Sequence, residues 1–120
     1  MTVRLLDYPK ARIRMLVTSP VEASHRIVAC QKQKATVEWI ESMRPGSVFL
    51  DCGCNTGAYS FVAASRSLTV HAVDPHVPTY HRLLDNLKLN EWAQITPHNF
   101  ALGDHDGRIG IAHQVAWQKL

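Results

Sequence analysis

A short apolar run that ends in an aspartate and a glycine-containing turn is the feature that most constrains the fold. Residues 47–51 read Ser-Val-Phe-Leu-Asp, and the chain continues as Cys-Gly-Cys-Asn-Thr-Gly to residue 57. An almost continuous apolar run of this length is typical of a strand buried on both faces, as in parallel sheets. Residues 58–65 then carry small and apolar side chains. The pattern predicts a strand, a tight turn and a helix packed on the sheet.

Two further strand candidates follow, each after a segment of helical length. Residues 68–73 are apolar and β-branched, residues 78–90 place leucines at helical spacing, and residues 94–102 form a third strand candidate that Pro97 weakens. Strands separated by helices favour a parallel sheet with right-handed crossovers. The expected fold class is therefore α/β, a Rossmann-like parallel sheet with flanking helices, truncated after the third central strand.

The residues before this unit form a lead-in that ends at Arg44-Pro45-Gly46. We therefore divide the chain into residues 1–46, the lead-in, and residues 47–120, the βαβαβ half-domain. Turn and breaker residues and apolar spacing predict the remaining elements. These are a strand at 11–18, a short helix at 21–30, a helix at 35–43, a turn at 104–107 and a strand at 108–113.

Composition and charge exclude several classes of function. The chain is 46% hydrophobic and 19% charged, as expected of one globular domain with one core. Its net charge of +3 is too mild, and too little organised into a basic stripe, for a nucleic-acid-binding surface.

The sequence has no membrane or export signal. No window approaches the roughly 18 apolar residues of a membrane helix, and the first residues lack the apolar run of a signal peptide. We expect a cytoplasmic protein with no nucleic-acid partner and no membrane partner.

The cysteines indicate a reducing compartment and no metal site. There are three, Cys30, Cys52 and Cys54, with no CxxC pair and no histidine at metal-ligand spacing. A disulfide between Cys52 and Cys54 would need strained geometry. We expect both to be small packing residues.

The turn after the first expected strand carries residues suited to a ligand. In an open parallel sheet, ligands bind beyond the carboxyl ends of the strands, and the first strand–helix turn is the usual place for a nucleotide-like cofactor. Gly53 lets the backbone approach a ligand, and Gly57 lets the chain turn tightly into the next helix. Asn55 tolerates the left-handed region, so it holds a special backbone angle and still offers an amide.

Two aspartates are expected at the same edge of the sheet as this turn. Asp51 ends the first strand and Asp74 ends the second, and parallel strands bring both carboxylates to one rim. Asp74 lies 17 residues after Gly57, near the separation at which an acidic residue accepts hydrogen bonds from two ribose hydroxyls. Asp51 is expected to orient the turn or to meet an ammonium group of the ligand.

Two other interpretations of the turn stay open. Glycines after a buried strand serve tight turning and helix packing in many proteins, and terminal aspartates are solvated or cap helices. A nicotinamide or flavin site requires the spacing GxGxxG, whereas Gly53 and Gly57 are spaced GxxxG. A diphosphate-binding loop is therefore poorly supported.

Three stretches together resemble a known family. They are Pro-Gly-Ser-Val-Phe-Leu-Asp-Cys-Gly-Cys-Asn-Thr-Gly at 45–57, His-Ala-Val-Asp-Pro at 71–75, and Asn86 to Asn90 followed by Asn-Phe-Ala-Leu-Gly-Asp at 99–104. They are similar to the first strand and loop (usually D-x-G-A-N-x-G), the second-strand end and the third strand of the FkbM-type methyltransferases. That family is part of the class I Rossmann-like group.

The resemblance implies S-adenosylmethionine as the cofactor. Two positions depart from the family pattern: Cys54 stands where alanine is usual, and Asp74 stands where glutamate is usual. An aspartate is one methylene shorter, so the ribose would have to lie slightly closer. The implied cofactor-binding residues are Gly53, Cys54, Asn55 and Gly57 along the methionine part, Asp74 at the ribose, and Pro75 and Ala101 beside the adenine, with Asp51 and Asn99 nearby.

The resemblance also implies O-methyl transfer to a sugar or secondary metabolite, and so a small-molecule or glycan acceptor. The family's sheet continues through a fourth strand beside the first, and no such segment follows Leu120. The first strand is thus expected to be an uncovered apolar edge, to be completed by a missing C-terminal half or by an oligomer. The alternative function is a truncated, non-catalytic module that binds the methyl donor or a protein partner.

No catalytic residue is predicted. Methyl transfer from a sulfonium depends mainly on the positioning of donor and acceptor. The chain has seven histidines, and nothing in the sequence selects one of them as a general base.

Overall fold

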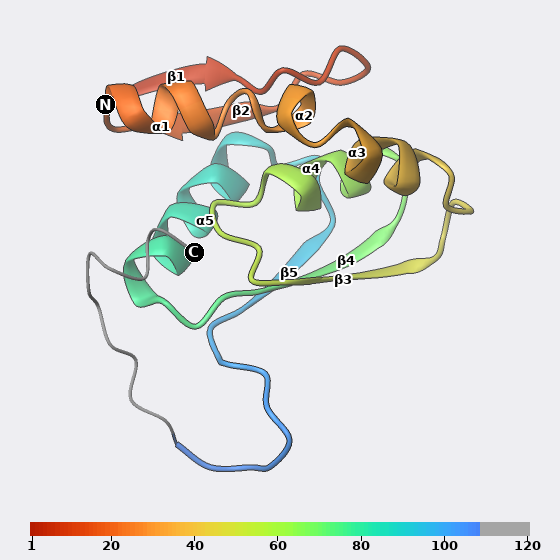
Figure 1. Cartoon of the computed structure of the whole chain (residues 1–120), viewed down its shortest axis with the longest axis vertical. Helices are drawn as coiled ribbons and strands as arrows, with labels where there is room; N and C mark the ends of the chain where they lie inside the picture. The colour runs from red at the N-terminus through yellow and green to blue at the C-terminus, as the bar shows by residue number, and fades with distance from the viewer. Residues whose placement is uncertain (109–120) are drawn as a thin grey trace.

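The computed structural model describes residues 1–108, so nearly all of the strand expected at 108–113 lies outside the described residues. None of the described helices is both long and apolar enough to cross a membrane. The strands are β1 Thr2–Leu5, β2 Arg14–Val17, β3 Val48–Cys52, β4 Thr69–Val73 and β5 Ile95–His98, and the helices are α1 Pro20–His25, α2 Ala29–Lys32, α3 Lys34–Glu41, α4 Ala58–Ser65 and α5 Val77–Leu89 (Figure 1).

The central element is a parallel three-stranded sheet of order β3-β4-β5. Phe49 pairs with Val70 between β3 and β4, and Val70 pairs with Ile95 between β4 and β5. Helix α4 connects the first pair of strands and α5 connects the second. The expected α/β fold with a βαβαβ unit is confirmed, because each apolar run became a strand and each segment of helical periodicity became a helix.

Both connecting helices lie on one face of this sheet, and the β1-β2 hairpin lies beyond them (Figure 1). Phe49 points to the covered face and is 6% exposed, whereas its neighbours Val48 and Leu50 are 69% and 56% exposed. The expectation that this strand is buried on both faces is therefore wrong for the described part of the chain. The expectation of an uncovered apolar edge is confirmed, because β3 pairs with β4 alone among the described strands.

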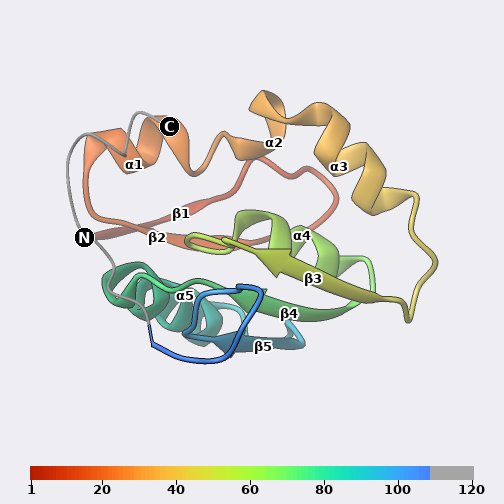
Figure 2. The same ribbon diagram turned by 60° about the horizontal axis from the view of Figure 1, so that its bottom comes forward.

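The lead-in folds as an antiparallel hairpin followed by three short helices, seen above the sheet in Figure 2. Strand β2 is the strand expected at 11–18, β1 was not predicted, and the helix expected at 21–30 is divided into α1 and α2. Buried side chains on both sides of residue 46, such as Ile40 and Phe61, belong to one hydrophobic cluster. The division of the chain at residue 46 stays a prediction.

Candidate functional site

The turn between β3 and α4, which we call loop 53–57, has a strongly constrained backbone. Gly53, Asn55 and Gly57 have positive φ angles of 73°, 56° and 104°. The left-handed conformation expected for Asn55 is thus confirmed. The N–H groups of Gly53 and Cys54 both donate to the carbonyl oxygen of Val73, at 2.8 and 3.0 Å, so the loop is fastened to the end of β4.

Asp74 fastens the loop a second time. Asp74 is a buried residue, with 8% of its surface exposed. Oδ2 accepts a hydrogen bond from the Asn55 N–H at 3.0 Å, and Oδ1 accepts one from the His76 N–H at 3.0 Å. Because each carboxylate oxygen has two lone pairs, these bonds leave acceptor capacity at both oxygens. The sequence did not indicate this loop-holding role, which is compatible with the predicted ribose contact.

The remaining predicted residues lie at the same end of the sheet, with one exception. The Asn99 amide donates to the carbonyl oxygens of Asp74 and Pro75, at 3.0 and 3.3 Å, and so holds the segment after β4 against the segment after β5. Ala101 lies in the exposed segment beyond β5. The structure therefore brings together Asp51, loop 53–57, Asp74, Pro75 and Asn99, and it leaves Ala101 at the periphery.

Asp51 is a mostly buried carboxylate at the end of β3. Burial raises its pKa above the ordinary value, a hydrogen bond from the Ser60 hydroxyl opposes that rise, and the nearby charge of Asp74 adds to it. The Ser60 Oγ donates to Asp51 Oδ2 at 2.7 Å. Ser60 lies on the first turn of α4, and no sequence pattern indicated this contact. A positively charged group placed beside Asp51 would stabilise its ionised form.

The raised pKa of Asp51 predicts a pH-dependent gain in stability for Asp51→Asn. The native state holds this proton to higher pH than the unfolded chain, so ionisation of Asp51 opposes folding. The penalty is absent below the ordinary value of 3.8, grows as the pH rises, and is complete above the raised pKa. Since asparagine can still accept from Ser60, the variant should be more stable than the parent by about 1 kcal/mol at neutral pH.

Urea unfolding of both proteins at several pH values from about 4 to about 8 measures this difference. Asp85→Asn, on the exposed side of α5, is the matched control and should show no comparable gain. A difference between Asp51→Asn and the parent that shrinks as the pH rises would contradict the assignment.

A cavity of about 310 Å³ lies on the side of loop 53–57 that faces the lead-in. Asp51, the loop itself and Tyr59 of α4 form one wall, and residues 25–33 of the lead-in contribute the other. The Tyr59 hydroxyl donates to the Ala29 carbonyl oxygen at 3.1 Å, which ties the two walls together. The volume is at the lower end of the range of about 300–1,000 Å³ for small-molecule sites.

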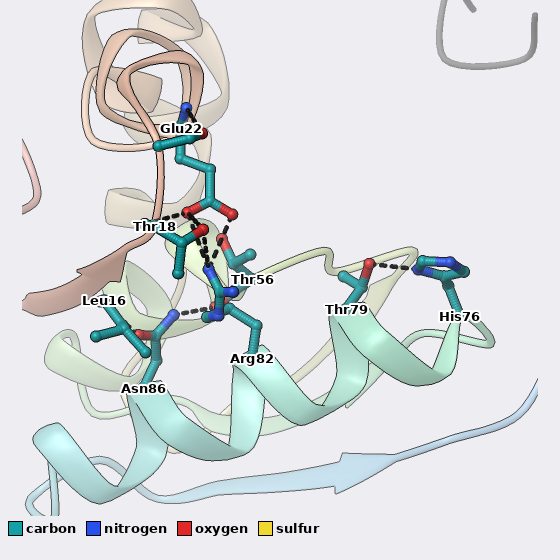
Figure 3. Close-up of polar contacts among 9 residues, drawn as sticks. Leu16, Thr18, Glu22, Thr56, His76, Thr79, Arg82 and Asn86 are labelled. Atoms are coloured by element: carbon teal, nitrogen blue, oxygen red, sulfur yellow. Dashed lines mark hydrogen bonds and ion pairs between the residues drawn. The ribbon is translucent and has the colours of Figure 1, made fainter. Parts of the chain in front are cut away.

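A polar network connects the lead-in and α5 to loop 53–57 (Figure 3). The fully buried Asn86 accepts a hydrogen bond from the Leu16 N–H at 2.7 Å and donates to the Thr56 carbonyl oxygen at 3.0 Å. Arg82, one turn earlier, pairs with Glu22 at 2.8 Å. Sequence reasoning missed this role of Asn86. The sequence did contain a signal: Asn86 lies three positions after Leu83, on the same buried face of α5, and a buried asparagine needs hydrogen-bond partners.

The three cysteines are free thiols and differ in their surroundings. Cys54 is buried within loop 53–57, and burial raises its pKa to about 12. Cys30 is also buried, whereas Cys52 is exposed on the uncovered face of β3. The expected packing role is confirmed for Cys54 and wrong for Cys52 in the described residues. Within residues 1–108, no three His, Cys, Asp or Glu side chains gather as metal ligands would.

The described fold is similar to several solved structures, one of which is a SAM-dependent methyltransferase. The SAM-dependent methyltransferase from Agrobacterium tumefaciens aligns with a TM-score of 0.57 and 20% identity over 80% of this chain and 31% of that chain. Trm5b from Pyrococcus abyssi aligns with a TM-score of 0.54 and 19% identity over 82% and 28%. P. horikoshii TYW2 in complex with MeSAdo aligns with a TM-score of 0.55 and 18% identity over 83% and 36%.

This chain therefore spans about a third of the length of these structures. No protein-family model and no curated protein matches the sequence. At identities of 18–20% the similarity concerns the fold. Residues 1–108 have a Rossmann-like α/β fold that matches part of the fold of the S-adenosylmethionine-dependent methyltransferases.

Proposed function

We propose that this chain forms the methyl-donor-binding part of an S-adenosylmethionine-dependent methyltransferase. The observation that carries the proposal is loop 53–57, where three alternate residues with positive φ follow a parallel strand and Asp74 holds the loop from the next strand. Backbone that lies open at the carboxyl end of the first strand is where Rossmann-like sheets bind nucleosides. The fold similarity to P. horikoshii TYW2, whose structure is a complex with MeSAdo, supports the same ligand class.

The residues of the site fit the proposed methyl donor. The Asn55 Oδ1 atom is buried and has no hydrogen-bond partner among the described residues. A buried acceptor left unsatisfied costs about 1–3 kcal/mol, so a ligand that brings a hydrogen-bond donor to this wall relieves the cost. Gly53 has no atom within 4 Å of the position of a Cβ, so a ligand can approach the backbone closely there.

We assign the cofactor contacts along the rim of the sheet. Bound S-adenosylmethionine supplies a methyl group that is already activated on a sulfonium, so the protein's task is to hold and orient it. In this assignment Gly53, Cys54, Asn55 and Gly57 line the methionine part with Asp51, Asp74 binds the ribose, and Pro75 and Ala101 flank the adenine, with Asn99 holding Pro75 in place.

The finer parts of the proposal rest on the sequence motifs. We propose an FkbM-type enzyme that transfers a methyl group to an oxygen of a sugar or secondary metabolite in the cytoplasm. The absence of a nucleic-acid partner stays a prediction. A non-catalytic donor-binding or interaction module is the second candidate, favoured by one observation: Val48 and Leu50 leave an apolar strip exposed on β3 among the described residues, and such a strip suits contact with a partner.

Calorimetric titration with S-adenosylhomocysteine tests the proposed function. The 120-residue chain should bind, and Asp74→Ala should bind at least about tenfold more weakly, because the variant loses the ribose acceptor and one fastening of the loop. Asp85→Ala, an exposed aspartate on α5, is the matched control and should bind as the parent does. Circular dichroism verifies that each protein is folded. If the parent is folded and does not bind S-adenosylhomocysteine at millimolar concentration, the proposal is contradicted. Preferential binding of NAD would favour the dinucleotide interpretation.

A further inference from the structure

The cavity beside loop 53–57 has walls of opposite electrostatic character. On the lead-in side, it is lined by Arg26, which follows α1, and by Lys32, the last residue of α2. On the sheet side, it is lined by Asp51 and by Asn55. The basic side chains lie more than 20 positions away from the glycine motif in the sequence. Arg26 and Lys32 lie opposite loop 53–57 only because the lead-in packs against the unit that carries this loop.

The positive wall has no acidic partner of its own. Within residues 1–108, neither Arg26 nor Lys32 forms an ion pair with a carboxylate. Lys32 Nζ lies 2.7 Å from His25 Nδ1. Because an ammonium group donates and never accepts, the histidine nitrogen is the acceptor, and this contact leaves the charge of Lys32 uncompensated. An anionic ligand group in the cavity would therefore meet two cationic side chains.

The opposite wall offers acceptors. Asp51 has a carboxylate whose Oδ2 is held by Ser60 at 2.7 Å. Asn55 also lines the cavity, and its buried Oδ1 lacks a partner among the described residues. A cationic donor of the ligand suits both of these groups. The cavity thus matches a ligand end that carries a carboxylate on one side and an ammonium on the other.

The positive wall is also fixed in place. The Tyr59 hydroxyl bonds to the Ala29 carbonyl oxygen at the start of α2. Arg82 of α5 pairs with Glu22 of α1, and both groups are largely shielded from solvent, with side-chain exposures of 21% and 22%. These contacts hold both short helices against the unit that carries loop 53–57. The lead-in is therefore positioned as one side of the site.

We propose that the cavity holds the amino-acid end of the methyl donor, with Lys32 and Arg26 binding its carboxylate and Asp51 and Asn55 binding its ammonium group. This inference rests on the proposed function. It makes residues 25–33 a part of the cofactor site and gives the chain a means to distinguish an intact donor from adenosine compounds that lack the carboxylate.

Three probes and two variants test the inference by calorimetry. The probes are S-adenosylmethionine, its decarboxylated form, and 5′-deoxy-5′-methylthioadenosine, which has no amino-acid group. Lys32→Gln and Arg26→Gln should each weaken binding of S-adenosylmethionine about tenfold, equivalent to about 1.4 kcal/mol, and leave the other two probes unchanged. Lys34→Gln, two residues away on α3 and outside the cavity lining, is the matched control and should change none of the three affinities.

The outcomes separate this inference from the proposed function. If the parent binds all three probes and both variants retain the parent's affinity for S-adenosylmethionine, the carboxylate contact is wrong and the proposed function stands. If the variants bind all three probes more weakly by the same factor, the substitutions have a structural effect, and this result would also overturn the inference. If the folded parent binds none of the probes, the proposed function fails and this inference fails with it.

Discussion

Replacing Gly57 with alanine should lower the free energy of unfolding by about 3 kcal/mol or more. The φ of Gly57 is +104°, where side chains are strained, and an added Cβ would lie 2.7 Å from Leu83 Cδ1 and 3.0 Å from Phe61 Cε2. Leu83 and Phe61 are both fully buried, so neither moves aside without disturbing the core between α4 and α5. Domains are stable by only about 5–15 kcal/mol. Urea unfolding should therefore show a large loss.

Gly46→Ala is the matched control for this change. Gly46 also has a positive φ, +87°, but an added Cβ would find no atom within 4 Å. Its replacement should cost backbone strain alone, about 1–2 kcal/mol. The excess cost of Gly57→Ala then measures the clash with the core. Equal costs at the two positions would show that the close approach of Gly57 to Leu83 does not constrain this residue.

Replacing Asn86 with leucine should cost about 2–5 kcal/mol of stability and should also weaken ligand binding. The Asn86 side chain is fully buried and satisfies the Leu16 N–H of β2 and the Thr56 carbonyl oxygen of loop 53–57. Leucine has similar volume and no polar atoms, so both backbone groups would lose their partner. Urea unfolding measures the loss of stability, and titration with S-adenosylhomocysteine measures the effect on the loop.

Asn90→Leu separates the two consequences. Asn90, one turn later on the same buried face, bonds to the N–H and the carbonyl oxygen of Arg14, at 2.9 and 2.7 Å. It is as buried as Asn86 and has no hydrogen bond to loop 53–57. Its replacement should lower stability by a similar amount, yet leave the affinity of the folded protein for S-adenosylhomocysteine unchanged. If both variants weaken binding equally, Asn86 has no special role in holding the loop.

The βαβαβ unit was predictable because its signals are local. Each of β3, β4 and α5 follows from the apolar spacing of a few consecutive residues, and the observed bounds differ from the expected ones by a few positions at most. The left-handed conformation of Asn55 was predictable for the same reason, since backbone sterics leave few residue types for that region. Strand β1 was missed because its signal is short: Thr2–Leu5 alternates polar and apolar residues over only four positions.

Burial of β3 was predicted wrongly because burial is a property of what packs on a strand. An apolar run indicates that both faces suit an apolar environment, but α4 and α5 lie on the same face of the sheet (Figure 1). Val48 and Leu50 are consequently exposed among the described residues. The order of elements along the chain does not by itself say which face each helix covers.

Residue spacing was enough to predict the parallel sheet, the special backbone of loop 53–57 and the gathering of Asp51 and Asp74 at one rim. The packing of the whole chain decided the rest. Asn86 holds Leu16 across 70 positions of sequence, and Arg82 holds Glu22 across 60. Arg26 and Lys32 line the same cavity as loop 53–57 because the contacts of Asn86 and Arg82 anchor the lead-in. Local patterns report the conformation of neighbouring residues, whereas contacts between distant segments depend on how their surfaces fit together once the chain is folded.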